Sequence, residues 1–217
     1  MAAFEQGVSR GRPGAGFTLI EILVAMLILT IGLLGLVGMQ AVAQRAEVES
    51  YQRAQAMVLM NDIVDRINTN RKAATCYAIT TVPASGTKFI GTAGTGKYDT
   101  ASFSCPSLAT NPNAVARAQL DLQLIEAMLL GASETIGGAS VGAMLGARAC
   151  IGYDDAGKAY TVAIAWQGFS KTFSPADWPT ANNPAIARNC ALNLYGSGGD
   201  DAQRRVVWTT LMIAALS

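Results

Sequence analysis

The sequence contains no histidine among its 217 residues. This absence excludes Ser-His-Asp and Cys-His catalysis, zinc sites that need histidine, and a histidine pH switch. Charged residues are scarce, at 14 % of the chain, about half of the ~25 % usual in soluble proteins, and such a low fraction argues against disorder. The chain has 16 Lys and Arg against 15 Asp and Glu, and this balance argues against a nucleic-acid binder. The four cysteines form no CxxC pair, so no zinc knuckle is expected.

One long apolar run lies near the N-terminus. Residues 22–44 carry no charge and no proline, and as a helix they would be ~34 Å long, enough to cross a ~30 Å hydrocarbon layer. Arg10 and Arg12 precede the run, so the positive-inside tendency predicts a cytoplasmic N-terminus and an exported remainder. A removable signal peptide is the alternative interpretation, because residues 41–43 (Ala-Val-Ala) are a candidate cleavage site after the run.

Glu21 argues against a plain signal peptide, because it places a carboxylate just inside the apolar run. A charge in the middle of a bilayer costs roughly 2.5–3.5 kcal/mol, and less near the interface, so such residues usually have a function. If the chain were cut between Gly16 and Phe17, the new α-amine would start a helix with Glu21 four residues on, on the same helix face. The amine and the carboxylate could then neutralise one another within one helix or between adjacent copies.

The six residues from Gly16 to Glu21 (GFTLIE), followed by the apolar run, resemble the prepilin motif of type IV pilins and pseudopilins. The resemblance implies that a prepilin peptidase cleaves after Gly16 and methylates the amine of Phe17. It also implies that Glu21 pairs with the terminal amine of a neighbouring subunit during assembly. The expected organisation is a leader (1–16), a transmembrane and assembly half of the N-terminal helix (17–44), an amphipathic half (45–72) and a periplasmic globular domain (73–217).

Four further segments resemble PilV-type minor pilins: residues 33–40 (LLGLVGMQ), 148–151 (RACI), 162–168 (VAIAWQG) and 204–207 (RRVV). The resemblance implies a non-enzymatic subunit without cofactors. It would be held in the inner membrane and then incorporated at or near the tip of the pilus, where it supports assembly, adhesion and twitching motility. The implied partners are the prepilin peptidase, the inner membrane, other minor pilins, the major pilin and a candidate tip adhesin. A minor pseudopilin of type II secretion is the nearest alternative, and a membrane-tethered exported enzyme or binding protein is the alternative from another class.

The exported part reads as an α+β arrangement, in which a long helix is covered by at least three antiparallel strands. The helix stripe consists of Ala56, Met57, Met60, Ile63, Val64 and Ile67, at the spacing of one helix face. Arg71 and Lys72 suit the end of this helix. A second helix is expected over 113–130, with Leu120, Leu122, Leu124, Ile125, Met128 and Leu129 on its apolar side.

Strands are expected in the last third of the chain, with loops between the regular elements. Residues 147–153 and 159–167 read as a hairpin with one buried face, because larger side chains alternate with smaller ones in the second strand. Residues 205–215 are rich in β-branched residues and read as the last strand. We expect the stretches 84–104, 131–146 and 169–199 to be irregular, since they are rich in glycine, proline or small polar residues.

Four cysteines allow three pairings. We favour Cys76–Cys105 and Cys150–Cys190, because each pair closes the loop-rich region nearest in sequence. An exported domain lies in an oxidising compartment, where disulfides persist.

Four further motifs resemble functional sites, but none is predicted to bind a nucleotide or a metal or to catalyse a reaction. The segment 91–97 fits GxxxxGK, but Tyr98 stands where a phosphate-binding loop needs Ser or Thr. Ser140 lies in a GxSxG pattern, yet no histidine can serve it as a base, and nothing selects Lys158 or Lys171 instead. The pairs at 154–155 and 200–201 (Asp-Asp) lack the spacing of a calcium loop and read as solvated turns, so no metal site is expected. The pair at 204–205 (Arg-Arg) reads as a solvated strand start.

Overall fold

The computed structural model describes residues 16–105, 110–132, 134–196 and 201–213. Residues 1–15 of the predicted leader, Asp200 and the predicted strand end at 214–215 lie outside these ranges. The chain divides into two compact units, Met1–Ala46 and Glu47–Ser217. Each unit is considered by itself below.

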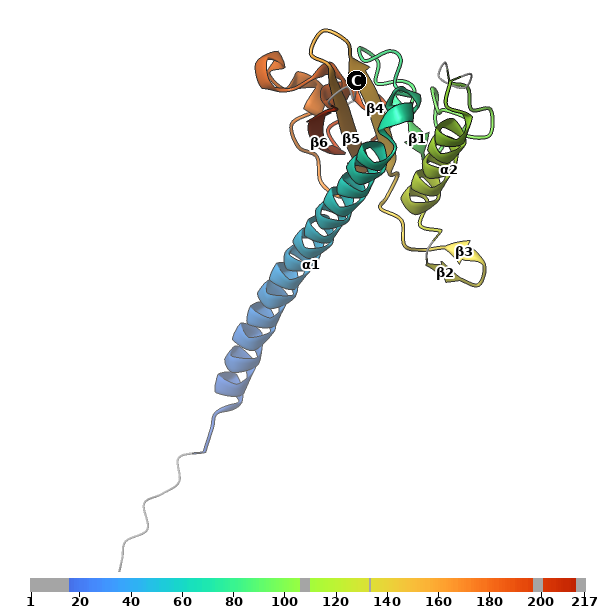
Figure 1. Cartoon of the computed structure of the whole chain (residues 1–217). Helices are drawn as coiled ribbons and strands as arrows, with labels where there is room; N and C mark the ends of the chain where they lie inside the picture. Colours follow the sequence, from blue (N-terminus) through green and yellow to red (C-terminus); the bar gives the residue numbers. More distant parts are fainter. Residues whose placement is uncertain (1–15, 106–109, 133, 197–200, 214–217) are drawn as a thin grey trace, which may run out of the picture. The chain divides into compact units, whose positions relative to one another are not determined.

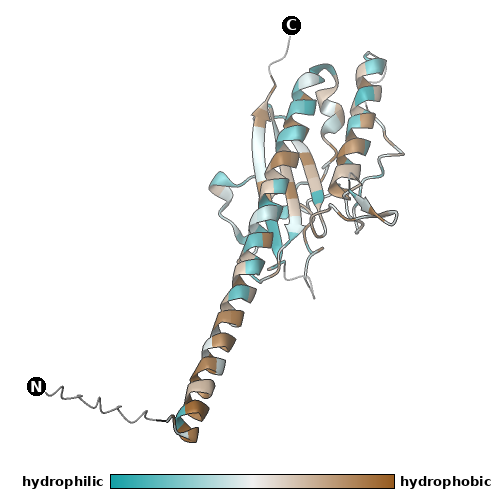
Figure 2. Ribbon diagram, turned by 90° about the horizontal axis from the view of Figure 1, so that it is seen from below, coloured by the Kyte–Doolittle hydropathy of each residue, from teal (hydrophilic) through white to brown (hydrophobic). Residues whose placement is uncertain are grey.

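Helix α1 spans Leu19–Thr69 and is 51 residues long. The run from Leu19 onward contains no proline, and its apolar residues cluster in the N-terminal part, as the brown colour of that part shows (Figure 2). The helix ends at Thr69, where the side chain of Asn70 donates hydrogen bonds to the Ala114 carbonyl (2.8 Å) and to the Tyr77 hydroxyl (3.1 Å). The sequence predicted Arg71 and Lys72 at the end of the long helix. They lie instead in the following 3-10 helix η1 (Arg71–Tyr77).

Four strands form one antiparallel sheet in the order β1-β4-β5-β6 (Figure 1). Their bounds are Ile90–Gly91 for β1, Arg148–Asp154 for β4, Ala159–Gln167 for β5 and Arg204–Met212 for β6. The hairpin of β4 and β5 was predicted, and β6 begins and ends earlier than expected. The α+β arrangement with a long helix and a small antiparallel sheet is confirmed.

Strand β5 is buried on both faces, whereas the sequence predicted one buried face. Its large side chains, such as Val162 and Ile164, pack in a core cluster with residues of α1 and α2. Ala163 and Ala165, on the other face, pack in a second cluster with Ile186 of α3. Small residues on that face are explained by the second layer of chain that covers them.

The amphipathic half of α1 supplies one layer of the larger core. Ala56, Ile63 and Ile67 are completely buried, while Met57 remains 41 % exposed and lies at the margin of the predicted stripe. Helix α2 spans Pro112–Leu129 and buries Val115, Ala118, Leu122, Ile125 and Leu129. This spacing of three and four residues defines its inner face. Leu120 and Leu124, predicted on the apolar side, fall on the outer face and are 59 % and 52 % exposed.

The stretches predicted as irregular contain short elements. Strand β1 lies in the first, and the second holds a small hairpin of β2 (Thr135–Ile136) and β3 (Ala139–Ser140). Gly137 and Gly138 join these strands with φ of +61° and +85°, a turn that needs positive φ at both positions and so favours a Gly-Gly pair. The third stretch holds η3 (Pro175–Asp177), η4 (Thr180–Asn182) and the short α3 (Ala185–Asn189).

Candidate processing and assembly site

The predicted cleavage bond lies just before the helix. Gly16, Phe17 and Thr18 have no regular secondary structure, and α1 begins at Leu19. The side chain of Phe17 is 79 % exposed. A methyl group built on Gly16 would meet no other atom within 4 Å. The described surroundings of the Gly16–Phe17 bond therefore present no steric barrier to a peptidase.

Glu21 lies in the first turn of α1 and is exposed. The Thr18 carbonyl accepts hydrogen bonds from the backbone N–H groups of Glu21 (3.1 Å) and Ile22 (3.3 Å), so the turn is already closed at Thr18. The positive end of the helix dipole favours a carboxylate at this position. Glu21 forms no ion pair with another described residue of the chain. Its carboxylate is therefore available to a cation from outside the described part.

The apolar part of α1 that follows Glu21 has no covering layer among the described residues of its own unit. Its large side chains are exposed, from Leu19 at 82 % to Val42 at 67 %. The only hydroxyl in the stretch 22–39, that of Thr30, donates to the Leu27 carbonyl at 2.9 Å and is satisfied within the helix. The helix is long and apolar enough to cross a membrane, with a mean hydropathy of 2.7 over its most apolar window.

Three glycines, Gly32, Gly35 and Gly38, interrupt this apolar surface. A methyl group built on any of them would meet nothing within 4 Å. Nothing inside the described chain therefore requires glycine at these positions. Small residues of this kind let helices approach one another closely in a membrane.

A polar network fixes the end of α1 to the globular unit. Arg66 binds Asp62 through Nε (2.7 Å) and Asp121 of α2 through Nη1 (2.8 Å). The Tyr77 hydroxyl donates to the second oxygen of Asp121 at 2.5 Å. Burial, and then the bond to Asp121, raise the pKa of Tyr77, and the bond to Asp62 raises the pKa of Arg66. These groups hold α1, η1 and α2 in one arrangement.

The globular unit contains two disulfides, one between Cys76 and Cys105 and one between Cys150 and Cys190. These are the two pairs favoured from the sequence. Their Cα atoms lie 5.2 Å and 5.7 Å apart. The second bond joins β4 to the residue that follows α3, across the smaller core cluster.

The arginine pair at the start of β6 was predicted to be solvated, and this prediction is wrong: Arg204 is buried and Arg205 is half-buried. Arg204 is 0 % exposed and its Nη1 donates to the carbonyls of Arg188 (2.8 Å) and Cys190 (3.1 Å). Asp201, predicted as a solvated turn residue, is 2 % exposed and lies 3.2 Å from Nε of Arg204. Burial lowers the pKa of Arg204, and the charge of Asp201 opposes this effect. Arg205 binds Glu49 of α1 at 2.9 Å. A motif of two adjacent arginines gave no sign of this, because the buried partners come from distant segments.

In the described part of the chain, the residues of the other motifs occupy ion pairs and exposed positions. Lys97 binds Glu126 at 2.6 Å and is engaged in an ion pair. Ser140 is exposed on the two-residue strand β3. Lys158 binds the exposed Asp155 at 2.6 Å. In the described part of the chain no three His, Cys, Asp or Glu side chains gather as they would around a metal ion.

Comparison with known proteins identifies two consecutive regions. Residues 12–37 match the family described as the prokaryotic N-terminal methylation motif, and residues 38–102 match the family described as type IV pilin Tt1218. No curated protein and no solved structure matches the chain. The first match covers the cleavage bond and Glu21, and the second covers the remainder of α1, η1 and strand β1. With these two matches, a long N-terminal helix and a small antiparallel sheet with two disulfides, the chain is a type IV pilin-like protein of the α+β pilin fold.

Proposed function

We propose that the chain is a minor pilin of a type IV pilus, a structural subunit that helps to initiate assembly at or near the tip and supports adhesion and twitching motility. The observation that carries this proposal is the exposed apolar half of α1, which has Glu21 as its one charge and an open Gly16–Phe17 bond before it. An apolar helix surface of this extent needs lipid or other helices to cover it.

Processing precedes assembly in this proposal. A prepilin peptidase removes residues 1–16 and methylates the amine of Phe17. In the membrane, the carboxylate of Glu21 and the cationic amine of a neighbouring subunit are both poorly solvated, so that pairing them offsets the cost of each charge. Glu21 thus gives the helix a defined axial register relative to its neighbour.

The proposed location follows from the charge and the cysteines. Arg10 and Arg12 keep the N-terminus in the cytoplasm, and the globular unit is exported. The two disulfides agree with an oxidising compartment outside the inner membrane. The partners in this setting are the prepilin peptidase, other minor pilins, the major pilin and a tip adhesin.

The minor-pilin role is supported by the PilV-like segments in the second half of α1's apolar run and in β5. Residues 162–168 form the central part and end of β5 and the residue after it, so this resemblance falls on the strand buried on both faces. Type IV pilins are structural rather than enzymatic proteins, and the same role is proposed for this chain.

The first test is the mass of the mature N-terminus. We expect a methylated Phe17, and a protein that keeps its first 16 residues, or that begins at Gln44, would contradict the proposal. Gly16→Leu should leave the precursor uncut. Gly38→Leu is the matched control, because both glycines have open space around them and only Gly16 precedes the bond.

The second test is deletion of the protein in its own cell. Loss of surface pili and of twitching motility is expected. Loss of secreted enzymes with pili retained would assign the chain to the minor pseudopilins of type II secretion. A catalytic turnover that is independent of Glu21 would assign it to membrane-tethered enzymes.

A further inference from the structure

Strand β6 has one edge that no other strand of the described residues covers. It is the terminal strand of the order β1-β4-β5-β6, and it is nine residues long. Long edge strands present a row of unpaired backbone groups to other chains, and proteins usually blunt them with proline, lysine or a covering segment. The sequence of β6, RRVVWTTLM, contains neither proline nor lysine.

The hydrogen-bond register shows which backbone groups point outward. The Gly168 N–H donates to the Gln203 carbonyl at 2.8 Å, one step beyond the pair Gln167 and Arg204. In an antiparallel ladder, pairs that exchange hydrogen bonds alternate with pairs that do not. The odd-numbered residues of β6 therefore bond to β5, and the N–H and C=O groups of Val206, Trp208 and Thr210 point away from it. These outward groups make no hydrogen bond to a described residue.

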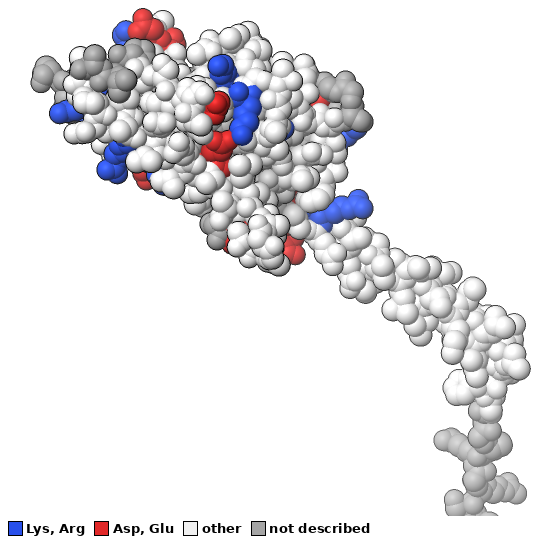
Figure 3. Space-filling model, turned by 90° about the vertical axis from the view of Figure 1, so that its right-hand side faces the viewer, with Lys and Arg blue, Asp and Glu red and all other residues white. Residues whose placement is uncertain are grey.

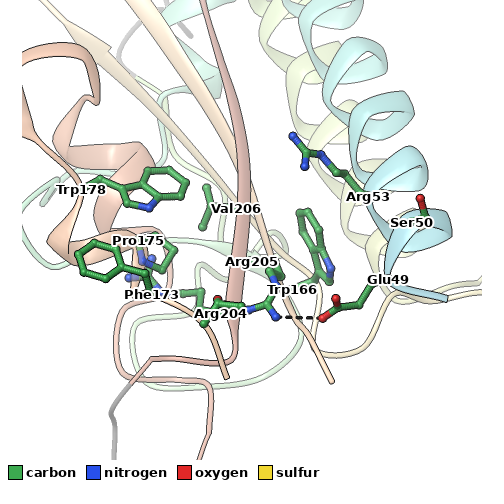
Figure 4. A pocket seen from close by; sticks show the side chains of 11 residues that line it. Glu49, Ser50, Arg53, Trp166, Phe173, Pro175, Trp178, Arg204, Arg205 and Val206 are labelled. Carbon is green, nitrogen blue, oxygen red and sulfur yellow. Dashed lines mark hydrogen bonds and ion pairs between the residues drawn. The ribbon is translucent and has the colours of Figure 1, made fainter. Parts of the chain in front are cut away.

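A groove follows this edge. Two adjoining hollows of about 420 and 410 Å³ are lined by Arg204–Val206 and by Val206–Trp208. Helix α1 forms one wall of both hollows, and residues of the segment 172–183 form the opposite wall. A third hollow, of about 570 Å³, lies over the face of the sheet, because residues of β4 and β5 line it together with Trp208 and Thr210. Figure 4 shows the first hollow, with Arg53 on the α1 side of β6 and Trp178 on the other side. We call the first two hollows together the β6 edge groove.

The walls of the β6 edge groove indicate what fits it. Met57 and Met60 of α1 face Trp178 across the second hollow, so the middle of the groove is apolar. At the end near the start of β6, Arg205 is already paired with Glu49, while Arg53 is exposed and forms no ion pair with a described residue. Figure 3, which presents the side of the molecule that lies on the right in Figure 1, shows small groups of blue and red side chains among mostly white ones.

A second copy of β6 would fit this groove poorly. In antiparallel pairing, the far end of the second β6, with Thr210 and Met212, would lie beside Arg53. Neither residue carries a carboxylate that could form an ion pair with the guanidinium of Arg53. A strand of a different polypeptide can supply that group.

We propose that the β6 edge groove receives an extended strand of a different polypeptide, which adds antiparallel to β6 and places an acidic side chain beside Arg53. From Val206 to Met212 the edge spans ~20 Å, which about seven extended residues match. Backbone hydrogen bonds supply the affinity and the alternate side chains supply the specificity in this mode of recognition. The inference rests on the proposed function only for the source of the strand, a neighbouring subunit of the pilus tip.

The test uses the full chain in detergent and a synthetic nine-residue peptide of alternating valine and threonine that ends in glutamate. Antiparallel addition places this last residue near Arg53. All three tryptophans of the chain, Trp166, Trp178 and Trp208, line the groove, so intrinsic fluorescence reports on its occupation by a peptide without tryptophan. Saturable binding is expected, and a peptide with glutamate at its first position should bind more weakly.

Variants separate the edge from the rest of the surface. Thr210→Pro removes an outward N–H but none of the bonds to β5, and should weaken peptide binding at least ~10-fold, while Thr210→Val keeps the N–H and should bind as the wild type does. Arg53→Glu should also weaken binding, and Lys72→Glu makes the same charge change at an exposed residue outside the groove.

Amide hydrogen exchange of the wild-type protein, measured with and without peptide, tests strand addition to β6 even where a variant folds poorly. Bound peptide should protect the amides of the even-numbered residues that it covers, Val206, Trp208, Thr210 and Met212, because these N–H groups gain partners. Absence of saturable binding, or of protection at these alternate amides, would overturn the proposal. Concentration-dependent self-association that protects the same amides without peptide would also overturn it, in favour of a second copy. Neither result would alter the N-terminal mass or the deletion phenotype, so the proposed function is tested separately.

Discussion

Replacement of Arg204 by methionine tests the enclosed charge at the start of β6. Arg204→Met keeps most of the side-chain volume and removes the guanidinium. In the wild type this group binds the carbonyls of Arg188 and Cys190 and lies beside Asp201. The variant leaves a carboxylate that is 2 % exposed without its cation.

The expected loss of stability is large for a single substitution. Removal of one partner of a buried ion pair costs about 3–5 kcal/mol, and the two carbonyls lose a charge-assisted donor. A loss of about 4 kcal/mol corresponds to a fall in Tm of about 8–16 °C for a unit of this size. Since the groups share one site, their separate costs are not additive.

Thermal unfolding of the full chain in detergent, followed by circular dichroism, measures the effect. Arg71→Met is the matched control, because Arg71 is exposed and its side chain donates to the nearby Asn68 carbonyl. The control should change stability by no more than about 0.5 kcal/mol. Addition of Asp201→Asn to Arg204→Met should restore part of the loss, since the unpaired charge is then removed. A melting temperature of Arg204→Met within about 2 °C of the wild type would refute the reasoning.

Three further outcomes are expected. Glu21→Ala should still be cleaved and methylated but should enter sheared pili roughly 100-fold less, because the neighbouring amine loses a pairing worth about 3 kcal/mol; wild-type amounts in the pilus fraction would contradict this. Replacement of Cys150 and Cys190 by alanine should cost about 4 kcal/mol in denaturant unfolding, since the bond closes a separation of 40 residues, and an unchanged midpoint would exclude it. Burial raises the pKa of Tyr160 and of Tyr195 to about 12, above the value of ~10 in an unfolded chain, so stability should be intact below pH ~10 and fall as the pH rises toward 12. Tyrosinate absorbance and circular dichroism should change together in that window, and ionisation of both tyrosines near pH 10 in the folded protein would count against the burial.

The long N-terminal helix could be predicted because its information is local. A charge in an apolar run, a glycine before a phenylalanine and an uninterrupted helix pattern all occupy adjacent positions in the sequence. The two central strands were also predicted, since their turn and their alternation are local signals. The end of α1 was predicted within a few residues, but its cause was not, because Asn70 ends the helix by bonding to Ala114 far along the chain.

The remainder depends on contacts between distant segments. Nothing near Arg204 or Asp201 in the sequence indicates that both will be buried, because the acceptors that make this tolerable belong to the segment after α3. The second covered face of β5 was missed for the same reason. The Gly-Gly turn between β2 and β3 is different, since it is a local hairpin signal that the glycine-rich surroundings obscured.

The separation in sequence between β5, which ends at Gln167, and β6, which begins at Arg204, has a consequence for folding. Under the proposed topology, β5 emerges on the far side of the membrane before β6. Until it arrives, the edge of β5 that it will cover is open, and β5 (AYTVAIAWQ) carries no charge at all. Such uncharged strands are the segments most prone to pair with other chains. Under the proposed topology, the emerging chain therefore passes through a stage of high aggregation risk, which lasts until β6 has crossed and paired with β5.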